Sequence, residues 1–272
     1  MPGSRRNIYV YQIFYDDISR RELDGGFIPL DNLSNERPDW FEFWVIRRFL
    51  TDTKLQEGAW YGFLSPKFQR KTGVNSKLLY EFLEHTFSHA DVALISPGWD
   101  QIAYFRNVFE QGEFWHPGLF DTSQRFFDRI GLNINLRTLT SHSLSSVFSN
   151  YIVAKPRFWN EWLRIANLFF EYVEHGDDLL SAAARSKTTY GTQNPILPMK
   201  TFVQERISSV IMAQGDFRVV NYDLSAIFPI FPKLFVDGLK TRRLLQTCDL
   251  LKQQYVTIKV GPPTASPIFL AP

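Results

Sequence analysis

Two acidic residues are placed where acid–base chemistry on a substrate needs them. Glu205 lies in Gln-Glu-Arg-Ile, near the start of a predicted late helix, and Asp100 follows a strand-like run that ends at Ser96. A carboxylate beside a bound hydroxyl can take its proton, so either residue is a candidate base. Each residue also has an ordinary structural explanation. Glu205 could be an early-helix acid that the helix dipole favours, and Asp100 could cap the helix that follows it.

A second polar group has the chemistry of a nucleotide-binding loop. The segment Phe27–Asn35 carries Asp31, Asn32 and Asn35 ahead of an aromatic helix, which offers donors and acceptors to a base or ribose. Plain turn chemistry explains the same residue types. Cations further along could neutralise a diphosphate or remain solvated loop charges. These cations are Lys67 at the end of a predicted strand, followed by Arg70 and Lys71.

The stretch Gln111–Leu119 is predicted as a projecting loop between two helices, because Gly112 and Pro117 interrupt the helical pattern. Exposed aromatic rings are costly without a partner, so this loop is expected to contact an acceptor. The alternative is a hydrophobic plug packed on the body of the protein. The expected acceptor contacts are Glu113, Trp115 and His116.

Several standard motifs are absent from the sequence. It contains no Gly-x-Gly-x-x-Gly, Gly-x-x-x-x-Gly-Lys, Gly-x-Ser-x-Gly or His-Glu-x-x-His, which removes the usual support for dinucleotide oxidoreductases, P-loop enzymes, serine hydrolases and zincins. Glu81, His85 and His89 share a predicted helix face that could hold a metal, although a helix C-terminus favours cations anyway. The acid-x-acid pair Glu22-Leu-Asp24 lies in a predicted turn. The cofactor therefore stays unassigned, with Mn²⁺ or Mg²⁺ as the candidates.

The composition is that of a globular protein with weak net charge. The 272 residues include 30 basic and 28 acidic side chains, for a net charge of +2, so bulk attraction to nucleic acid is not expected. A single cysteine excludes an internal disulfide and favours a reducing compartment, and no apolar run is long enough to span a membrane. Aromatic residues make up 16% of the chain, so rings either line a groove for sugars or bases or fill an aromatic-rich core.

The elements that must position these residues alternate between strand and helix. This alternation predicts an α/β domain with a mainly parallel sheet flanked by helices, and a ligand cleft at the carboxyl ends of the strands. Strands are predicted at 8–15, 59–64, 91–96, 147–154 and 217–222. Helices are predicted at 38–50, 75–87, 156–173, 200–214 and 234–254, with two more in 98–130 and a long loop at 181–198.

Several stretches, taken in order over about residues 8 to 215, resemble small bacterial glycosyltransferases of capsule and O-antigen biosynthesis. The stretches are Asp31-Asn32 with Asn35, the Trp40–Trp44 helix, Tyr61–Phe68, Ser149–Ala154 followed by Phe158-Trp-x-x-Trp162, and Gln204-Glu-Arg-Ile207. The resemblance implies a GT-A fold, which binds a nucleotide-diphospho-sugar, as a single domain over 1–272. Its donor side would cover about 8–110, its acceptor side about 111–222, and a C-terminal helical extension about 223–272.

The resemblance also implies a function and a set of partners. It implies transfer of a hexose-type sugar from a nucleotide-diphosphate donor to a hydroxyl of a surface glycan or lipid-linked glycan. The expected location is cytoplasmic, peripheral at the inner membrane face, and the expected context includes a larger multidomain protein. The alternative is a non-catalytic glycan- or nucleotide-binding module.

Carried over position by position, the resemblance implies a donor side that includes Asp31, Asn32, Asn35, Lys67 and Asn150, with Glu205 on the late helix. We add Gln12 and Arg47 to the expected donor contacts. The sequence departs from many such enzymes because no Asp-x-Asp follows any predicted strand. Metal dependence is therefore in doubt, and cations are expected to stabilise the leaving group instead. The candidates for that role are Arg47, Lys67 and Arg70.

Overall fold

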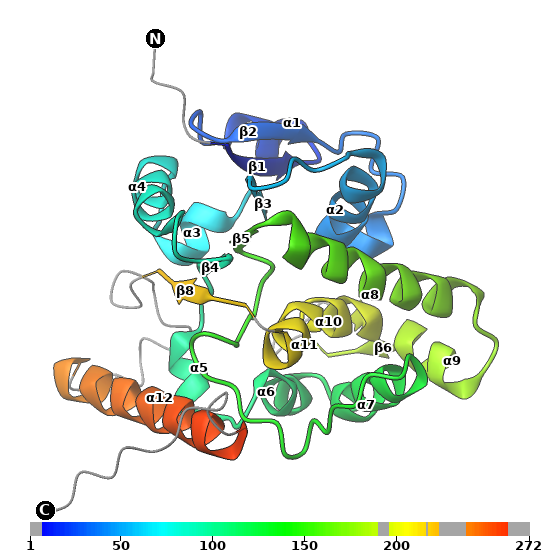
Figure 1. The fold of residues 1–272 in the computed structure, drawn as a ribbon. Coiled ribbons are helices and arrows are strands. Elements are labelled where there is room, and N and C mark those ends of the chain that lie inside the picture. The colour runs from blue at the N-terminus through cyan, green and yellow to red at the C-terminus, as the bar shows by residue number, and fades with distance from the viewer. Residues whose placement is uncertain (1–6, 190–195, 216, 223–237, 261–272) are drawn as a thin grey trace, which may run out of the picture.

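A six-stranded sheet organises the molecule, which is described here from a computed structural model over residues 7–189, 196–215, 217–222 and 238–260 (Figure 1). All neighbouring strands are parallel except where β5 pairs antiparallel with β3 and β4. The predicted mainly parallel α/β architecture is confirmed. The strands, in spatial order, are β2 (Ile28–Asp31), β1 (Ile8–Phe14), β3 (Trp60–Leu64), β5 (Ile152–Ala154), β4 (Val92–Leu94) and β8 (Val219–Asn221).

The central strands β3, β4 and β5 are buried on both faces, which explains why they are apolar rather than alternating with polar residues, whereas the edge strand β2 is mostly exposed. Successive residues of β3 pack into different cores: Trp60 and Leu64 join one, while Tyr61 and Phe63 join the other. Gly62 stands between them because a Cβ there would lie 2.8 Å from Cγ2 of Val153 on β5. The centre of the sheet is therefore tightly packed.

Helices cover the two faces unequally (Figure 1). The smaller core lies under α3, α4, α5 and α12, and the larger core lies under α2, α8 and the helices that pack around α8. The helices are α1 (Asp17–Arg21), the 3₁₀ turn η1 (Pro38–Trp40), α2 (Phe41–Asp52), α3 (Phe68–Thr72), α4 (Ser76–Thr86), α5 (Trp99–Tyr104), α6 (Val108–Trp115), α7 (Leu119–Arg129), α8 (Pro156–His175), α9 (Leu179–Arg185), α10 (Met199–Gln204), α11 (Ile207–Gln214) and α12 (Gly238–Val260).

Large aromatic rings fill the bigger core. Trp40, Trp159 and Trp162 are fully buried, and their rings pack against phenylalanines of α2 and α8. The Trp40 indole donates to Glu174 at 2.9 Å, while Lys200 bonds Asp39 and Glu174 beside it. Much of the unusual aromatic content therefore serves packing, which was one of the two alternatives for it.

Several predicted boundaries are wrong. Residues 98–130 form three helices rather than two, strand β5 covers only the end of the predicted 147–154 strand, and β2 lies inside a predicted polar loop. The predicted loop at 181–198 contains most of α9 and a short hairpin, β6 (Lys187–Thr188) with β7 (Leu197–Pro198); residues 190–195 lie outside the described part. The predicted helix at 200–214 breaks into α10 and α11, and the described part of the last helix starts at Gly238.

Candidate active site

The carboxyl edge of the sheet is the natural place for a site in this fold. Strand β1 lies between its parallel neighbours β2 and β3, so the chain leaves β1 in opposite directions across the sheet. In open α/β sheets, a ligand-binding crevice is expected outside the carboxyl ends of the strands at such a point. Ser65 follows β3 at this edge. Because β5 runs antiparallel, the residues that precede it, Asn150 and Tyr151, lie at the same edge.

Glu205 lies at the break between α10 and α11, close to the carboxyl edge of the sheet. Arg206, the next residue, is buried and donates to the backbone oxygens of Val108 and Phe202 at 2.8 and 2.7 Å and to Gln111 Oε1 at 3.0 Å. These bonds satisfy a buried guanidinium and lock the chain at the break. The Arg206 side chain is thereby committed to the interior, and Glu205 is left as the group available for chemistry.

Glu205 has the electrostatics of an acid–base group. Burial, and to a smaller extent the nearby Glu42, raise the pKa of its carboxyl, Arg206 and Lys71 lower it, and the net pKa is about 7. Its side chain nevertheless remains 35% exposed, so solvent or a substrate reaches it. A carboxyl that titrates near neutrality exchanges protons efficiently at physiological pH, and such shifts gather at functional sites.

Tyr151 marks the centre of the group around Glu205. Its hydroxyl is 2.8 Å from Ser65 Oγ, and Lys71 Nζ lies 5.8 Å from its ring. Burial raises the pKa of the Tyr151 hydroxyl well above its usual value, and the charges of Glu42, Glu205 and Arg70 also act on it. We call this set the Glu205 cluster: Glu42, Ser65, Arg70, Lys71, Tyr151 and Glu205.

The Glu205 cluster combines two capabilities. Glu205 can accept or donate a proton near pH 7, whereas the exposed Arg70 and Lys71 can bind a phosphate or diphosphate. The sequence predicted Glu205 as a candidate base and Arg70 and Lys71 as candidate diphosphate cations, whereas Tyr151 was included only as part of the Ser149–Ala154 stretch. The signal that could have found Tyr151 was its position at the start of β5, but only the antiparallel direction of that strand brings it to the carboxyl edge.

The predicted donor loop lies at the carboxyl end of β2. The Asp31 carboxylate accepts from the backbone N–H of Leu33 at 2.7 Å, and Asn35 adopts a positive φ of 38°, so both also serve the turn. Asn32 is buried, and among the described residues no hydrogen-bond partner reaches its Oδ1. A buried acceptor of this kind is costly unless a ligand or water satisfies it, which keeps Asn32 a donor-side candidate.

The other predicted donor residues fall in different places. Gln12 is buried and accepts from Asp24 N–H at 2.8 Å, and Arg47 donates to Asn167 on α8 at 2.7 Å with its guanidinium over a phenylalanine ring. Lys67 is exposed just before α3. The structure joins Asn150 to Ser208 of α11 at 3.4 Å, so Asn150 lies close to the α10–α11 break.

The prediction that Gln111–Leu119 projects from the protein as a loop is wrong. Its first five residues belong to α6, and Glu113 accepts from the N–H groups of Gly118 and Phe120, which caps α7. His116 is buried against Phe202 with ring centroids 3.5 Å apart, and burial lowers its pKa to about 4. Most of this segment is packed on the body of the protein, as the alternative supposed, whereas Phe114 is 66% exposed.

Two other acceptor-side and catalytic candidates are less accessible than expected. Trp115 is half-buried and stacks edge-on against Phe114. Asp100 is 1% exposed in the first turn of α5, where an acid complements the helix dipole. The geometry therefore favours Glu205 over Asp100 as the group that a substrate can reach.

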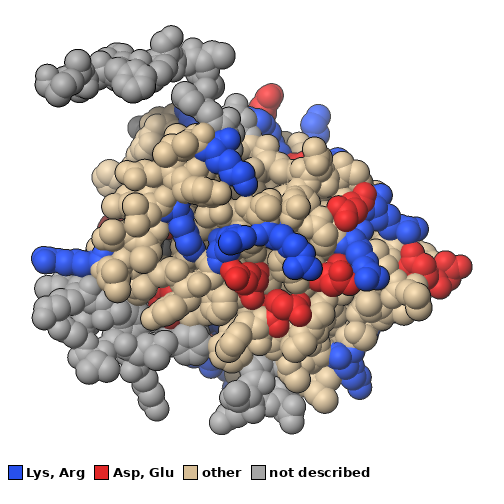
Figure 2. Space-filling view, turned by 90° about the horizontal axis from the view of Figure 1, so that it is seen from below, with Lys and Arg blue, Asp and Glu red and all other residues tan. Residues whose placement is uncertain are grey.

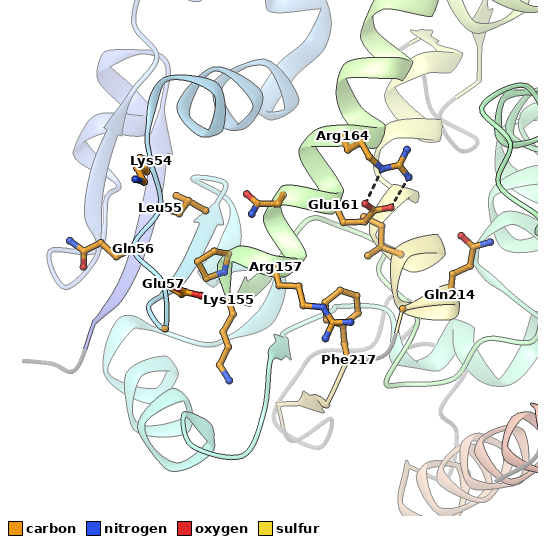
Figure 3. Close-up of a pocket in the computed structure, with 15 residues that line it drawn as sticks. Lys54, Leu55, Gln56, Glu57, Lys155, Arg157, Glu161, Arg164, Gln214 and Phe217 are labelled. Carbon is orange, nitrogen blue, oxygen red and sulfur yellow. Dashed lines mark hydrogen bonds and ion pairs between the residues drawn. The ribbon is translucent and has the colours of Figure 1, made fainter. Parts of the chain in front are cut away.

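A large depression lies at the opposite, amino edge of the sheet (Figure 3). Its volume is about 1100 Å³, and it is formed by the loop before β3, the start of α8 and the end of α11. Two of its cations are paired: Arg164 bonds Glu161 at 2.7 Å, and Lys155 bonds Asp91 at 2.9 Å. This depression was not predicted, because its walls come from three segments that lie far apart in the sequence.

Charge elsewhere is mixed. On the face seen from below, Lys and Arg side chains lie among Asp and Glu side chains (Figure 2). Over the described ranges, no three His, Cys, Asp or Glu side chains gather as a metal site, and His85 contacts the Glu81 carbonyl of its own helix at 2.6 Å. In the same ranges, no helix combines the length and apolarity needed to cross a bilayer.

Comparison with known proteins adds no assignment: no protein family, curated protein or solved structure matches the chain.

Proposed function

We propose that the chain is a glycosyltransferase of the GT-A type, which moves a hexose-type sugar from a nucleotide-diphosphate donor to a hydroxyl of a bacterial surface glycan. One observation carries the proposal. Glu205, with a pKa of about 7, shares the carboxyl edge of the sheet with the exposed cations Arg70 and Lys71. Sugar transfer from such a donor needs both parts, a proton acceptor and a cation for the leaving diphosphate.

The proposed step assigns each group one task. The Glu205 carboxylate takes the proton of the acceptor hydroxyl, whose oxygen attacks the anomeric carbon of the donor sugar. The bond from that carbon to the diphosphate oxygen breaks, and Arg70 and Lys71 stabilise the negative charge that develops on the diphosphate. Direct attack of this kind inverts the configuration at the anomeric carbon.

The two substrates would approach from different sides. The donor nucleotide would lie over β2, where Asp31 and Asn32 offer polar atoms, and a glycan or lipid-linked glycan acceptor would approach Glu205 from the Asn150 side. A ligand group that satisfies the buried Asn32 oxygen would gain binding free energy, because that atom is otherwise left without a hydrogen bond. These placements keep Asp31 and Asn32 on the donor side, but they move Asn150 from the donor contacts that the resemblance implies to the acceptor side.

A screen of nucleotide sugars tests the proposal. Melting temperature is measured with UDP-, GDP-, dTDP- and CMP-sugars, with and without Mn²⁺ or Mg²⁺, since a specific donor stabilises the native state by mass action. A donor that binds is then incubated with glycan acceptors, and release of the free nucleotide is quantified. Release that depends on Glu205 supports transfer. Binding without release would instead support a non-catalytic nucleotide- or glycan-binding module.

A further inference from the structure

Helix α12 has an apolar outer face that its packing leaves uncovered. Leu244, Leu251, Tyr255 and Ile258 follow one another at intervals of seven, four and three residues, so they share one side of the helix. They are 62%, 59%, 51% and 79% exposed. We call these four residues the α12 stripe. It extends over about 21 Å along the helix axis.

The stripe is distinct from the side of α12 that packs on the protein. On that inner side Leu245 is buried in the smaller core, and Lys252 Nζ donates to the backbone oxygens of Ile102 and Phe105 at the end of α5. The Asp249 carboxylate accepts from the N–H and hydroxyl of Ser143 at 2.7 and 2.6 Å. Because the inner side is already anchored, the stripe is a second apolar face, and the described part of the chain leaves it exposed.

The charges of α12 indicate what covers this face. Between residues 238 and 260 the sequence has five basic residues and a single acid, Asp249, which is bound to Ser143. Arg243 and Lys259 are exposed, and Lys259 Nζ lies 6.0 Å from the Tyr255 ring. Cations beside an exposed apolar stripe match an anionic lipid surface, where lysine and arginine reach the headgroups while leucine and isoleucine enter the acyl region.

A second copy of the chain fits the same face poorly. The stripe has the seven-residue spacing of a coiled-coil seam, but the exposed charged residue beside it is Lys259, and no acid flanks it between residues 238 and 260. Paired copies would therefore bring like charges or neutral side chains together instead of opposite charges. Tyrosine is also more typical of a membrane interface than of a tight helical seam, because its ring is apolar and its hydroxyl is polar.

We infer that the α12 stripe binds the surface of an anionic membrane, with α12 lying flat and its inner side fixed to the protein. This inference concerns a different region from the Glu205 cluster, and it does not depend on the proposed activity. Binding would be reversible, because a few apolar side chains and cations give surface attachment rather than insertion.

Vesicle sedimentation tests the inference with the full chain. The wild type is mixed with phosphatidylcholine vesicles that contain either 30% or no phosphatidylglycerol, at low and high salt. We expect binding to the anionic vesicles that weakens at high salt, and little binding to the neutral ones. Leu251→Glu should weaken binding at least tenfold, and the pair Arg243→Gln and Lys259→Gln should weaken it severalfold on anionic vesicles.

A matched control separates the stripe from general surface effects. Leu179→Glu makes the same change at a leucine of α9 that is 87% exposed, and it should bind vesicles as the wild type does. Circular dichroism should be unchanged in all variants, because every altered side chain is exposed. Absence of vesicle binding, or equal binding by Leu251→Glu and Leu179→Glu, would overturn the inference. A dimer in light scattering that Leu251→Glu dissociates, without vesicle binding, would assign the stripe to a second copy instead.

Discussion

Glu205 and Arg206 are neighbours in the chain, with Glu205 Oε2 3.9 Å from Arg206 Nη1, yet their side chains have opposite environments. The Arg206 side chain is 4% exposed and bonded on several sides, whereas the Glu205 side chain is 35% exposed. The buried cation lowers the pKa of Glu205, but burial outweighs it and the net pKa is about 7. Arg206 is thus the anchor that holds the chain while Glu205 keeps its proton near neutrality.

The close packing of Arg206 against Gly112 leads to a prediction about stability. Alanine is ordinarily the better residue inside a helix, by about 1 kcal/mol. A Cβ at Gly112 of α6, however, would lie 2.7 Å from Arg206 Nε, and the guanidinium is held by three partners. We expect Gly112→Ala to lower the free energy of unfolding by about 1 to 3 kcal/mol, as overpacking does. Gly25→Ala meets no atom within 4 Å and is the control. Equal stability of the two variants in urea denaturation would contradict this packing.

Asp91 links three strands at the amino edge of the sheet, because it precedes β4 and binds Lys155 after β5 and Arg218 before β8. Its carboxylate binds Arg218 through two bonds of 2.9 and 3.0 Å and Lys155 at 2.9 Å, and these partners hold its pKa well below the usual value. We expect Asp91→Asn to cost about 1 to 2 kcal/mol at pH 7. Because the folded-state pKa is lowered, this stability is present above about pH 4 and is lost as the pH falls.

Urea denaturation at pH 7 and pH 3 checks the role of Asp91. The difference between the wild type and Asp91→Asn should shrink at pH 3. Asp121→Asn serves as the control, because its pair with Arg125 is 60% exposed or more on both sides and such pairs add little. A pH-independent difference would show that Asp91 acts through packing instead of charge.

The donor-side assignment predicts a binding defect without loss of fold. Asp31→Ala removes an exposed carboxylate at the carboxyl end of β2, so it should weaken donor binding about tenfold while circular dichroism stays unchanged. Asp52→Ala, at the end of α2, is the matched control for removal of an exposed acid. Calorimetry that gives both variants the wild-type affinity for a donor nucleotide would remove Asp31 from the site.

The raised pKa of Glu205 predicts a stability effect with a defined sign. The folded protein binds this proton more tightly than the unfolded chain does, so the free energy of unfolding falls as the pH rises from about 4.5 towards 7. Glu205→Gln removes this half-buried charge and should therefore melt higher than the wild type at pH 8, with little difference at pH 4.5. Glu84→Gln, at an exposed position of α4, should change neither value. A lower melting temperature for Glu205→Gln at pH 8 would mean that the nearby cations stabilise the carboxylate.

Elements with strong periodicity were predictable from the sequence. The apolar run of β1 and the aromatic helix after Pro156 appear close to their expected bounds, because continuous apolar runs and helical spacing are local signals. The break between α10 and α11 was not predictable. It depends on Arg206 reaching Val108 and Gln111, about a hundred residues earlier in the chain, and no local pattern reports such contacts.

The candidate site was predictable only in part. Glu205, Arg70 and Lys71 were predicted as candidates from residue type, position and the resemblance, whereas the place of Tyr151 beside them follows from the sheet order and from the reversed direction of β5. His116 failed as an exposed acceptor contact because its ring completes the core against Phe202. Because Trp115 and His116 lie between Gly112 and Pro117, the local sequence is typical of a loop. Their burial depends instead on tertiary packing, which the local sequence does not show.

Nucleotide release by wild type and Glu205→Gln, with a donor shown to bind and a glycan acceptor, tests the central claim most directly. Glutamine keeps the shape of the side chain and removes its basicity. We predict that kcat falls about 10²-fold or more while the dissociation constant of the donor stays within about twofold. Near-normal turnover by Glu205→Gln, or no turnover by the wild type with any donor that binds, would contradict the role of Glu205 as the base of a glycosyl transfer.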